Sequence, residues 1–386
     1  DAEGLPVSKK VQEVTWSAEA AEKGGFPHFM LKEIYEQPKA VEDTIRVHLK
    51  KDKTISFENL NWTKNSLENI DSILITACGT AYHAGLVAKH YIERFAKIPV
   101  SVEIASEYRY SRPLTTGRTL CIVISQSGET IDTLAALKEA KRLGAQSIAV
   151  TNSVGSSIAR EADTAIYTVA GPEIAVASTK AYTTQLVSLL MLALYMGQIK
   201  GTIKEELAEK IIDGLLKLPK QIEKTLQEKD HMSEVADTLI KAEDIFYLGR
   251  SIDYAIAMEG ALKLKEVSYI HAEAYAAGEL KHGTLALITE KTPIIAVATQ
   301  ENVSSKMYSN IQEVRARGAK VLGIGYEDDT ELEKYTTEIV KIPRVDEFIA
   351  PILSVIPMQI LAYYTSVKRG NDVDKPRNLA KSVTVE

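Results

Sequence analysis

The chain has 386 residues, 45% of them apolar and 25% charged, as in soluble globular proteins, and it is long enough for two domains of ordinary size. Its formal net charge of −6 is spread along the whole chain, which argues against nucleic acid or an anionic membrane as the main partner. No apolar run reaches the length of a membrane span, and the first ten residues do not resemble a signal peptide.

The first half of the chain alternates apolar, strand-like runs with amphipathic stretches of helix length. After a helical pattern over about residues 26–60, residues 72–96 predict a strand, a tight turn at Gly79 and a helix. Residues 119–145 predict the same order of elements, and residues 146–163 add a third strand and turn. This alternation is typical of βαβ units and therefore of a parallel sheet.

The second half repeats this plan, so we expect an internal duplication. Residues 244–266 correspond to the unit at 72–96, and residues 292–319 correspond to the unit at 119–145, about 173 residues later. Residues 320–329 supply the corresponding third strand. We therefore predict an α/β fold of two doubly wound parallel-sheet domains.

Further segments connect the halves and end the chain. Residues 178–199 are apolar on most faces, which predicts a helix buried between layers or at an interface. Residues 200–235 are rich in Lys and Glu and predict an amphipathic helical connection. The last residues, from 370 on, carry Asp, Pro and Asn at spacings that argue against regular structure, and their Val-rich end favours a docked tail.

The two copies differ where the first has "SQSGET" and the second has "ATQENV". In the first copy, four polar residues follow an apolar strand closely: Ser125, Gln126, Ser127 and Thr130. At the carboxyl end of a parallel strand, such donors add to the unpaired N–H groups of the next helix, which suits a phosphate dianion. A single hydroxyl would merely cap the helix, with Glu129 in its first turn. Four donors within six residues favour a phosphate site in the first copy.

Motifs for other cofactors are missing from the sequence. It has no Gly-rich loop ending in Lys-Ser or Lys-Thr and no complete GxGxxG, which disfavours nucleotide hydrolysis and dinucleotide binding. Cys78 and Cys121 lack metal-ligand or redox spacing, so we expect buried, reduced thiols in a cytosolic protein. We expect no metal and no cofactor, and a small phosphorylated metabolite as the ligand.

Five ordered motifs resemble a known family: "CGTAYHAG", "SQSGET", "GPEIAVASTKAYTTQ", "KLKEVSYIHAEAYAAGELKHG" and "DKPRNLAKSVTVE". Together they are similar to the isomerase part of the glutamine–fructose-6-phosphate aminotransferases (glucosamine-6-phosphate synthases), which contains two sugar isomerase (SIS) domains. Residues 1–36 resemble the family's linker from an N-terminal glutaminase domain, which is absent here. Because the chain also lacks an initial Met, we expect an excised isomerase domain.

The resemblance implies a division of the chain into four parts. They are a linker from the absent glutaminase domain (1–25), a first SIS, flavodoxin-like domain with N-terminal helices (26–205), a second SIS domain (206–370) and a C-terminal tail over the active site (371–386). It also implies a homodimer, and from composition and charge we expect this homodimer to be cytoplasmic and to have no nucleic-acid or membrane partner.

The resemblance also assigns the contacts to the substrate. It implies that the phosphate of fructose 6-phosphate is held by Thr80, Ser125, Gln126, Ser127 and Thr130, and that the sugar contacts Val176, Ser178 and Ala380. One position departs from the family pattern. The family often has a phosphate-contacting Ser directly after "CGT", but this sequence has Ala81, so we expect one donor to be missing.

Making an amino sugar from a ketose requires ring opening, imine formation at C2 and proton transfer between C1 and C2. Lys263 and Glu266 lie three residues apart on one helix face, the spacing of an ordinary surface ion pair. The resemblance implies instead that Glu266 moves the proton and that Lys263 steers its charge. By composition His282 would be a surface or capping residue and Lys381 a solvated tail lysine, but the resemblance assigns ring opening to His282 and a Schiff base with the keto group to Lys381.

The resulting prediction is an enzyme, the isomerase domain of glucosamine-6-phosphate synthase. It would form glucosamine 6-phosphate with ammonia from the glutaminase domain, and alone it would isomerise fructose 6-phosphate to glucose 6-phosphate. Two alternatives stay open. A non-catalytic sugar-phosphate sensor with the same double fold would need the phosphate cluster but neither Glu266 nor Lys381, and a phosphosugar deglycase or related isomerase would share the chemistry.

Overall fold

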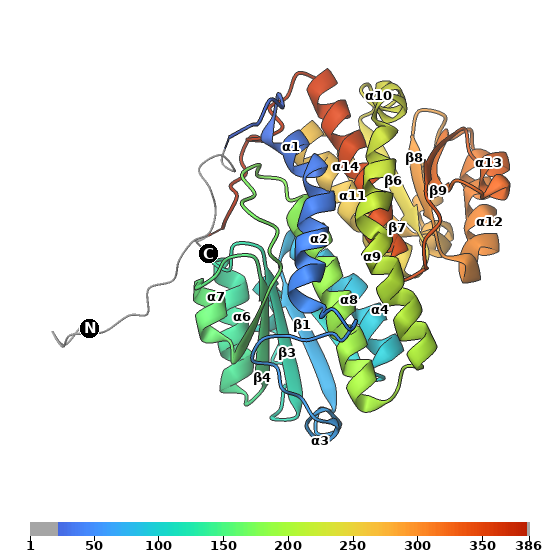
Figure 1. Ribbon diagram of the computed structural model, residues 1–386. Coiled ribbons are helices and arrows are strands. Elements are labelled where there is room, and N and C mark those ends of the chain that lie inside the picture. The colour runs from blue at the N-terminus through green and yellow to red at the C-terminus, as the bar shows by residue number, and fades with distance from the viewer. Residues whose placement is uncertain (1–21, 384–386) are drawn as a thin grey trace.

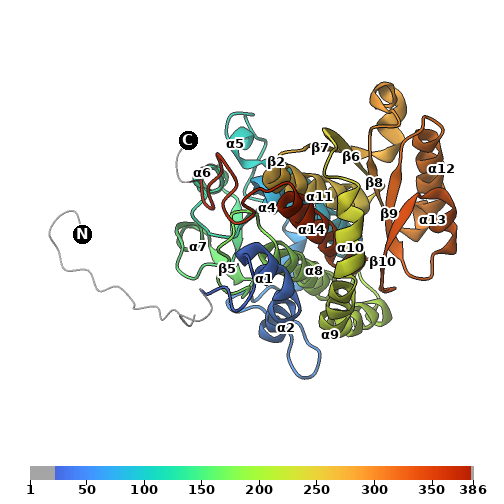
Figure 2. The ribbon, with the colours of Figure 1, turned by 90° about the horizontal axis from the view of Figure 1, so that it is seen from above.

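The computed structural model describes residues 22–383, which form two parallel β-sheets on either side of a layer of long helices (Figures 1 and 2). The predicted linker over residues 1–25 lies almost wholly outside the described residues. The proposed division of the chain at residues 205 and 370 stays a prediction.

The first sheet has five parallel strands in the order β2-β1-β3-β4-β5. Their bounds are β1 (Ser72–Ala77), β2 (Val100–Ile104), β3 (Thr119–Ser125), β4 (Gln146–Thr151) and β5 (Thr164–Tyr167). Every residue of the central strand β3 is buried, and the strand is rich in β-branched side chains. This is the pattern of a parallel strand covered by helices on both faces.

The second sheet has the equivalent order, β7-β6-β8-β9-β10, again with all neighbours parallel. Its strands are β6 (Asp244–Gly249), β7 (His271–Ala276), β8 (Ile294–Ala298), β9 (Val321–Tyr326) and β10 (Glu338–Ile342). Each strand takes the place of the strand five earlier in the chain. The predicted internal duplication of a doubly wound α/β domain is thus confirmed.

Helices connect the strands and separate the two sheets. In the N-terminal half they are α1 (Phe29–Tyr35), α2 (Gln37–His48), α3 (Lys64–Glu68), α4 (Gly79–Phe95), α5 (Ala105–Tyr108), α6 (Ile131–Arg142), α7 (Ser157–Glu161) and α8 (Lys180–Lys200). They continue with α9 (Glu205–Gln227), α10 (Lys229–Asp237), α11 (Ile252–Ser268), α12 (Ser304–Arg315), α13 (Thr330–Tyr335) and α14 (Ala350–Lys368). Short 3₁₀ helices are η2 (Ala277–His282), η3 (Thr284–Leu287) and η4 (Glu301–Val303).

The central helix layer holds the two halves together. Helix α11 packs against α14 and against α4, and α4 packs against α8. Gly260 permits the close approach of α11 to α14, because a Cβ atom there would lie 2.3 Å from Met358 Sδ. The helix predicted from residues 178–199 is α8, and nearly all its residues are buried. The layer therefore positions α4 and α11, which carry the residues discussed below.

Helix α14 is long and apolar enough, by length and composition, to cross a membrane. However, 89% of its apolar window is buried inside the described structure, between the second sheet and its neighbouring helices. That is the situation of a core helix.

One sequence prediction about secondary structure was wrong, and one segment departs from its local helix propensity. Residues 26–60 were expected to be helical, but α2 ends at His48, and Lys53 and Asn59 adopt positive φ angles that a helix cannot contain. The run "HAEAYAAGEL" is rich in small, helix-forming residues, but its first six residues form the edge strand β7. There the run pairs with β6, and this tertiary pairing outweighs the helix propensity of alanine.

Candidate active site

The polar residues singled out in the first copy lie at the carboxyl ends of two neighbouring strands, β1 and β3. The chain leaves β1 toward β2 on one side and leaves β3 toward β4 on the other. Ligands of open α/β sheets bind at such reversals of strand order. The hydroxyl of Thr133, on α6, donates to Cys78 Sγ at 3.8 Å, so the loop after β1 and the start of α6 are in contact.

The hydroxyls after β3 gather around the start of α6. Ser125 Oγ lies 3.0 Å from Thr130 Oγ1 and accepts a hydrogen bond from the main-chain N–H of Gly128 at 3.0 Å. Ser127 Oγ accepts from the N–H of Glu129 at 3.2 Å. Gly128 has φ +66°, and a Cβ there would lie 2.0 Å from a serine oxygen, so the turn requires glycine. The loop offers hydroxyl donors beside a helix N-terminus, an arrangement that suits an anion.

Two further residues of the predicted phosphate set lie beside this loop. The Gln126 side chain is half-buried, and its main-chain carbonyl accepts from Asn152 N at 3.1 Å. Thr80 lies in the first turn of α4, next to the largely buried methyl group of Ala81. Ala81 supplies no polar atom, as the sequence suggested.

The side chain of Lys263, on α11, joins the two domains. It is completely buried, and its Nζ donates to Thr80 Oγ1 at 3.0 Å. The same nitrogen lies 2.6 Å from Glu266 Oε2 and 3.4 Å from Glu259 Oε1. The structure therefore brings the predicted pair Lys263 and Glu266 together with a member of the predicted phosphate site. The pair is not the solvated surface ion pair that its spacing alone indicates.

Glu259 is a member of this cluster that the sequence analysis did not identify. Its side chain is fully buried, accepts from Thr80 Oγ1 at 3.1 Å and lies 2.8 Å from His83 Nδ1. In the sequence it is simply a glutamate four residues before Lys263, a common helix-surface spacing. Only the packing of α11 against α4 shows that the pair is buried.

The electrostatics of the cluster keep Lys263 charged. Burial on its own lowers the pKa of an ammonium group, but the carboxylates of Glu266 and Glu259 outweigh it and raise the pKa of Lys263 above its ordinary value. A permanently charged lysine cannot act as a nucleophile. It can hold the Glu266 carboxylate, whose side chain is 21% exposed, in a fixed position.

Lys381, in the tail, lies beside the loop that contains Val176 and Ser178. Its Nζ lies 2.5 Å from Glu173 Oε2 and donates to the carbonyl of Ala175 at 2.8 Å. Ser178 Oγ donates to the same Glu173 oxygen at 2.9 Å, and the N–H of Val176 donates to a main-chain carbonyl of the tail at 3.0 Å. The structure thus brings together three residues predicted to contact the sugar.

Several contacts dock the tail between distant elements (Figure 2). The carboxylate of Asp374 accepts from the N–H groups of Phe29 and Met30, at the N-terminus of α1. The N–H of Arg377 donates to the phenol oxygen of Tyr269, at the C-terminal end of α11, at 2.8 Å. The carbonyl of Val383 accepts from the N–H of Ile131, the first residue of α6, at 3.2 Å. Lys381 lies between these anchors, and the exposed Ala380 precedes it.

Two buried carboxylates face this lysine. Burial and the charge of Glu173 raise the pKa of Glu33 to about 8, although Glu33 accepts from the N–H groups of Ile174 and Ala175. Burial also raises the pKa of Glu173, but Lys381 and main-chain N–H groups outweigh burial and bring it below its ordinary value. No charge pattern in the sequence links residues 33, 173 and 381, which only the fold brings together.

His282 is separate from the other candidates. It is the last residue of η2 and is exposed. Among the described residues it makes no hydrogen bond or ion pair with Lys263, Glu266 or Lys381. Within the described part of one chain, no hydrogen bond or ion pair links His282 to the site.

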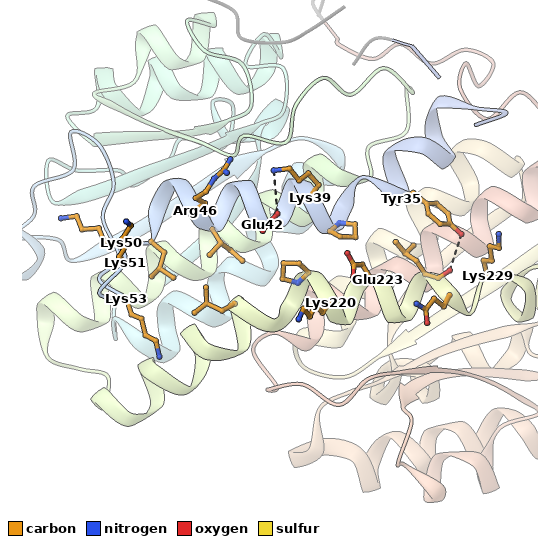
Figure 3. A pocket seen from close by; sticks show the side chains of 17 residues that line it. Tyr35, Lys39, Glu42, Arg46, Lys50, Lys51, Lys53, Lys220, Glu223 and Lys229 are labelled. Atoms are coloured by element: carbon orange, nitrogen blue, oxygen red, sulfur yellow. Dashed lines mark hydrogen bonds and ion pairs between the residues drawn. The ribbon is translucent and has the colours of Figure 1, made fainter. Parts of the chain in front are cut away.

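A separate groove of about 970 Å³ runs between α2 and α9 (Figure 3). Apolar residues such as Ile45, Leu216 and Pro219 line it, and lysines such as Lys50 and Lys220 stand at its edges. None of the predicted site residues lines this groove. It lacks the convergence of polar groups seen at β1 and β3.

Comparison with known proteins agrees with the geometry. The SIS domain family matches residues 66–195 and 238–369. The chain is 58% identical over 384 residues to a glutamine–fructose-6-phosphate aminotransferase (isomerizing) of Clostridium acetobutylicum, with 100% of the chain and 63% of that protein covered. It therefore spans less than two thirds of this relative.

Solved structures show the same likeness. The C-terminal domain of glucosamine-fructose-6-phosphate aminotransferase from Francisella tularensis is 41% identical with a TM-score of 0.87, covering 92% of this chain and all of that one. Glucosamine-6-phosphate deaminase from Thermotoga maritima is 26% identical with a TM-score of 0.72, covering 92% and 99%.

Replacing Glu33 by Gln is expected to reduce the dependence of stability on pH. The pKa of Glu33 rises from 4.5 to about 8 on folding, so the folded state holds an extra proton. The resulting stability is complete below about pH 4.5 and is lost as the pH rises through about 8. Gln resembles the protonated acid, so between about pH 5 and 9 the wild-type protein should lose up to about 5 kcal/mol of unfolding free energy relative to Glu33→Gln.

Urea denaturation at several pH values measures this difference. Glu42→Gln, at an exposed acid on α2, is the control and should keep the wild-type dependence. If the free energies of unfolding of Glu33→Gln and the wild type change with pH in parallel, the raised pKa of Glu33 is contradicted.

Proposed function

The chain belongs to the SIS domain family, and from this premise we propose that it is the isomerase part of a glutamine–fructose-6-phosphate aminotransferase. In this proposal it binds fructose 6-phosphate and forms glucosamine 6-phosphate when ammonia is supplied. Without ammonia it isomerises fructose 6-phosphate to glucose 6-phosphate. The observation that carries the proposal is the contact of the buried Lys263 with both Thr80 and Glu266, because it links a phosphate-site hydroxyl to a candidate base.

The phosphate is proposed to bind at the carboxyl ends of β1 and β3. Its contacts would be the hydroxyls of Thr80, Ser125, Ser127 and Thr130 together with Gln126. The N–H groups at the start of α6 add to these donors, and the glycine turn lets the main chain approach the anion. The sugar would then extend toward Val176, Ser178 and Ala380, since the tail docks on the same helix α6.

The tail lysine is proposed to react with the open-chain sugar. After ring opening, for which we propose His282, the neutral amine of Lys381 attacks C2 of the keto group, and water leaves as the imine forms. The lysine must first lose a proton. Glu173, whose carboxylate lies 2.5 Å from Nζ, is placed to accept it.

Glu266 is proposed to carry the proton between carbon atoms. It would remove a proton from C1 and return it to C2, which converts the ketose framework into the aldose one. Lys263 stays charged and holds the carboxylate while the proton moves. Every proposed step uses side chains of the protein itself, and we propose no metal or other cofactor.

The remaining part of the longer relatives suggests the source of ammonia. Because the chain spans 63% of its Clostridium acetobutylicum relative, we propose that a glutaminase domain in the rest of such a protein supplies ammonia from glutamine. We further propose a cytoplasmic homodimer without nucleic-acid or membrane partners. His282 would then serve the partner's site, which agrees with the lack, among the described residues, of any bond between it and the other candidates in its own chain.

A second candidate function is deamination of a phosphosugar. The likeness to a glucosamine-6-phosphate deaminase favours it, because removing an amine from C2 uses the same proton transfers. The identity of 26% is lower than the 41% shared with the aminotransferase domain. A third candidate, a non-catalytic sensor, is disfavoured. Binding a sugar phosphate alone requires neither the Glu266–Lys263 pair nor the docked Lys381.

The purified chain should convert fructose 6-phosphate to glucose 6-phosphate and release no glutamate from glutamine. Glu266→Gln should lower kcat by roughly 100- to 10,000-fold with little change in KM, because it removes the proposed base. A dehydrogenase-coupled assay for glucose 6-phosphate and a glutamate assay measure both activities. Glu205→Gln, at an exposed acid of α9, is the control. Wild-type protein that forms no glucose 6-phosphate would refute the function.

Borohydride added together with fructose 6-phosphate should trap the sugar on Lys381. Reduction fixes the imine as a stable amine, which peptide mass mapping locates. Lys381→Arg should abolish the adduct, whereas Lys375→Arg, at an exposed lysine of the same tail, should retain it. An adduct that maps to another lysine in the wild-type protein would show that a different residue forms the imine.

Mixing two inactive variants tests whether His282 acts in the partner's site. If His282→Ala and Glu266→Gln subunits exchange at random, about half the dimers are mixed, and each mixed dimer has one intact site. About a quarter of wild-type activity should therefore return. Native mass spectrometry verifies the exchange. A mixture that exchanges subunits but stays inactive would place His282 in the site of its own chain.

A further inference from the structure

The second domain contains a counterpart of the proposed phosphate site, at the carboxyl ends of β6 and β8. These strands take the places of β1 and β3 in the repeated strand order. Gly79 and Ser251 each follow their strand by two residues, and both have positive φ, +53° and +55°. Ala81 and Asp253 therefore occupy the same place in the first turns of α4 and α11.

The loops after the central strands also correspond. Cys121 lies opposite the third residue of β1, and Ile294 lies opposite the third residue of β6. Counting five residues onward, Gln126 corresponds to Thr299. Two residues further on, Glu301 of the second domain occupies the position of Gly128 in the first domain.

The carboxylate of Asp253 fills the space between these two elements. It is buried, with 1% exposure, and accepts from the main-chain N–H of Thr299 at 2.7 Å and from Thr299 Oγ1 at 2.6 Å. Burial raises its pKa to about 6, although these bonds and the N–H of Gln300 act to lower it. A carboxylate thus accepts from main-chain and hydroxyl donors at the position where the first domain has only the methyl group of Ala81.

We propose that Asp253 occupies the anion site of the second domain in place of a phosphate, and that this domain is a closed copy of the first domain's site. The proposal takes from the proposed function only that the loop after β3 binds phosphate. It explains why "SQSGET" is not repeated: a site filled by its own carboxylate has no need of a cluster of hydroxyls. The chain therefore has one sugar-phosphate site.

The bonds of Asp253 also hold the N-terminal end of α11 in place. Asp253 lies in the first turn of the helix, where the helix dipole favours a carboxylate. Lys263 and Glu266 lie further along the same helix, about 15–20 Å away at 1.5 Å per residue. The covalently attached carboxylate keeps this end of the helix bonded to Thr299 without any ligand.

The groups near Asp253 limit how well the second domain would bind an anion if the carboxylate of Asp253 were removed. Glu301 lies in the loop, but its side chain is 74% exposed and pairs with Arg344. Arg344 also pairs with Asp328, and Tyr326 lines the small neighbouring cavity of about 200 Å³. We expect weaker phosphate binding there than in the first domain, because no glycine lets the main chain approach the anion.

Calorimetric titration with inorganic phosphate tests the proposal in a background that lacks the first site, Ser125→Ala with Ser127→Ala. The background protein should bind no phosphate. Adding Asp253→Ala recreates the residue found in the first domain and should give one phosphate per chain. Adding Asp253→Asn instead keeps the space filled with a group of the same shape and should give none.

Binding of no phosphate by the folded Asp253→Ala protein, or equal binding by the Asn variant, would overturn the proposal. Should Asp253→Ala fail to fold, the reciprocal change decides: Ala81→Asp in the wild-type chain should abolish phosphate binding, while Ala81→Ser keeps it. Unaltered binding by Ala81→Asp would overturn the proposal too. If the wild-type chain binds no phosphate, the proposed function fails, but the comparison of Asp253 variants still stands.

Discussion

A completely buried ammonium group, that of Lys263, connects the two domains. It contacts Thr80 of the first domain and the carboxylates of Glu259 and Glu266 on its own helix. Removing one partner of a buried ion pair typically lowers the free energy of unfolding by about 3–5 kcal/mol. The packing of α11 against α4 therefore requires Lys263 together with all of its partners. The same atoms hold Thr80, a residue of the proposed phosphate site, and Glu266, the proposed base, at a fixed separation. Stability and the proposed chemistry therefore depend on the same contacts.

The tail provides a second connection, between the two ends of the chain. Asp374 accepts from the first N–H groups of α1, and Lys381 pairs with Glu173 beside Glu33 of that same helix. Holding two buried carboxylates close together is unfavourable unless one is protonated or a cation lies between them. Lys381 supplies this cation. A sugar that reacts with Lys381 must separate its amine from Glu173. The proposed reaction therefore changes the charges around Glu173 and Glu33.

The sequence predicted the architecture well because two local signals were strong. The alternation of buried strands with amphipathic helices repeats about 173 residues apart, and "SQSGET" sits directly after a strand. The parts it missed depend on packing between distant elements. Glu259 has the spacing of a surface ion pair until α4 covers it, and Glu33 belongs to a short helix with no recognisable motif. Residues 49–60 contain polar and apolar residues at helical intervals, but local turns replace the helix there.

The most direct test of this account is a crystal structure of the chain with fructose 6-phosphate. We expect the phosphate within hydrogen-bond distance of Ser125, Ser127 and Thr130, with C2 of the sugar close to, or covalently bound to, Lys381. We also expect Glu266 next to C1 and C2, with its contact to Lys263 retained. A sugar phosphate bound elsewhere, for example in the lysine-edged groove between α2 and α9, with the loop after β3 left empty, would contradict this expectation.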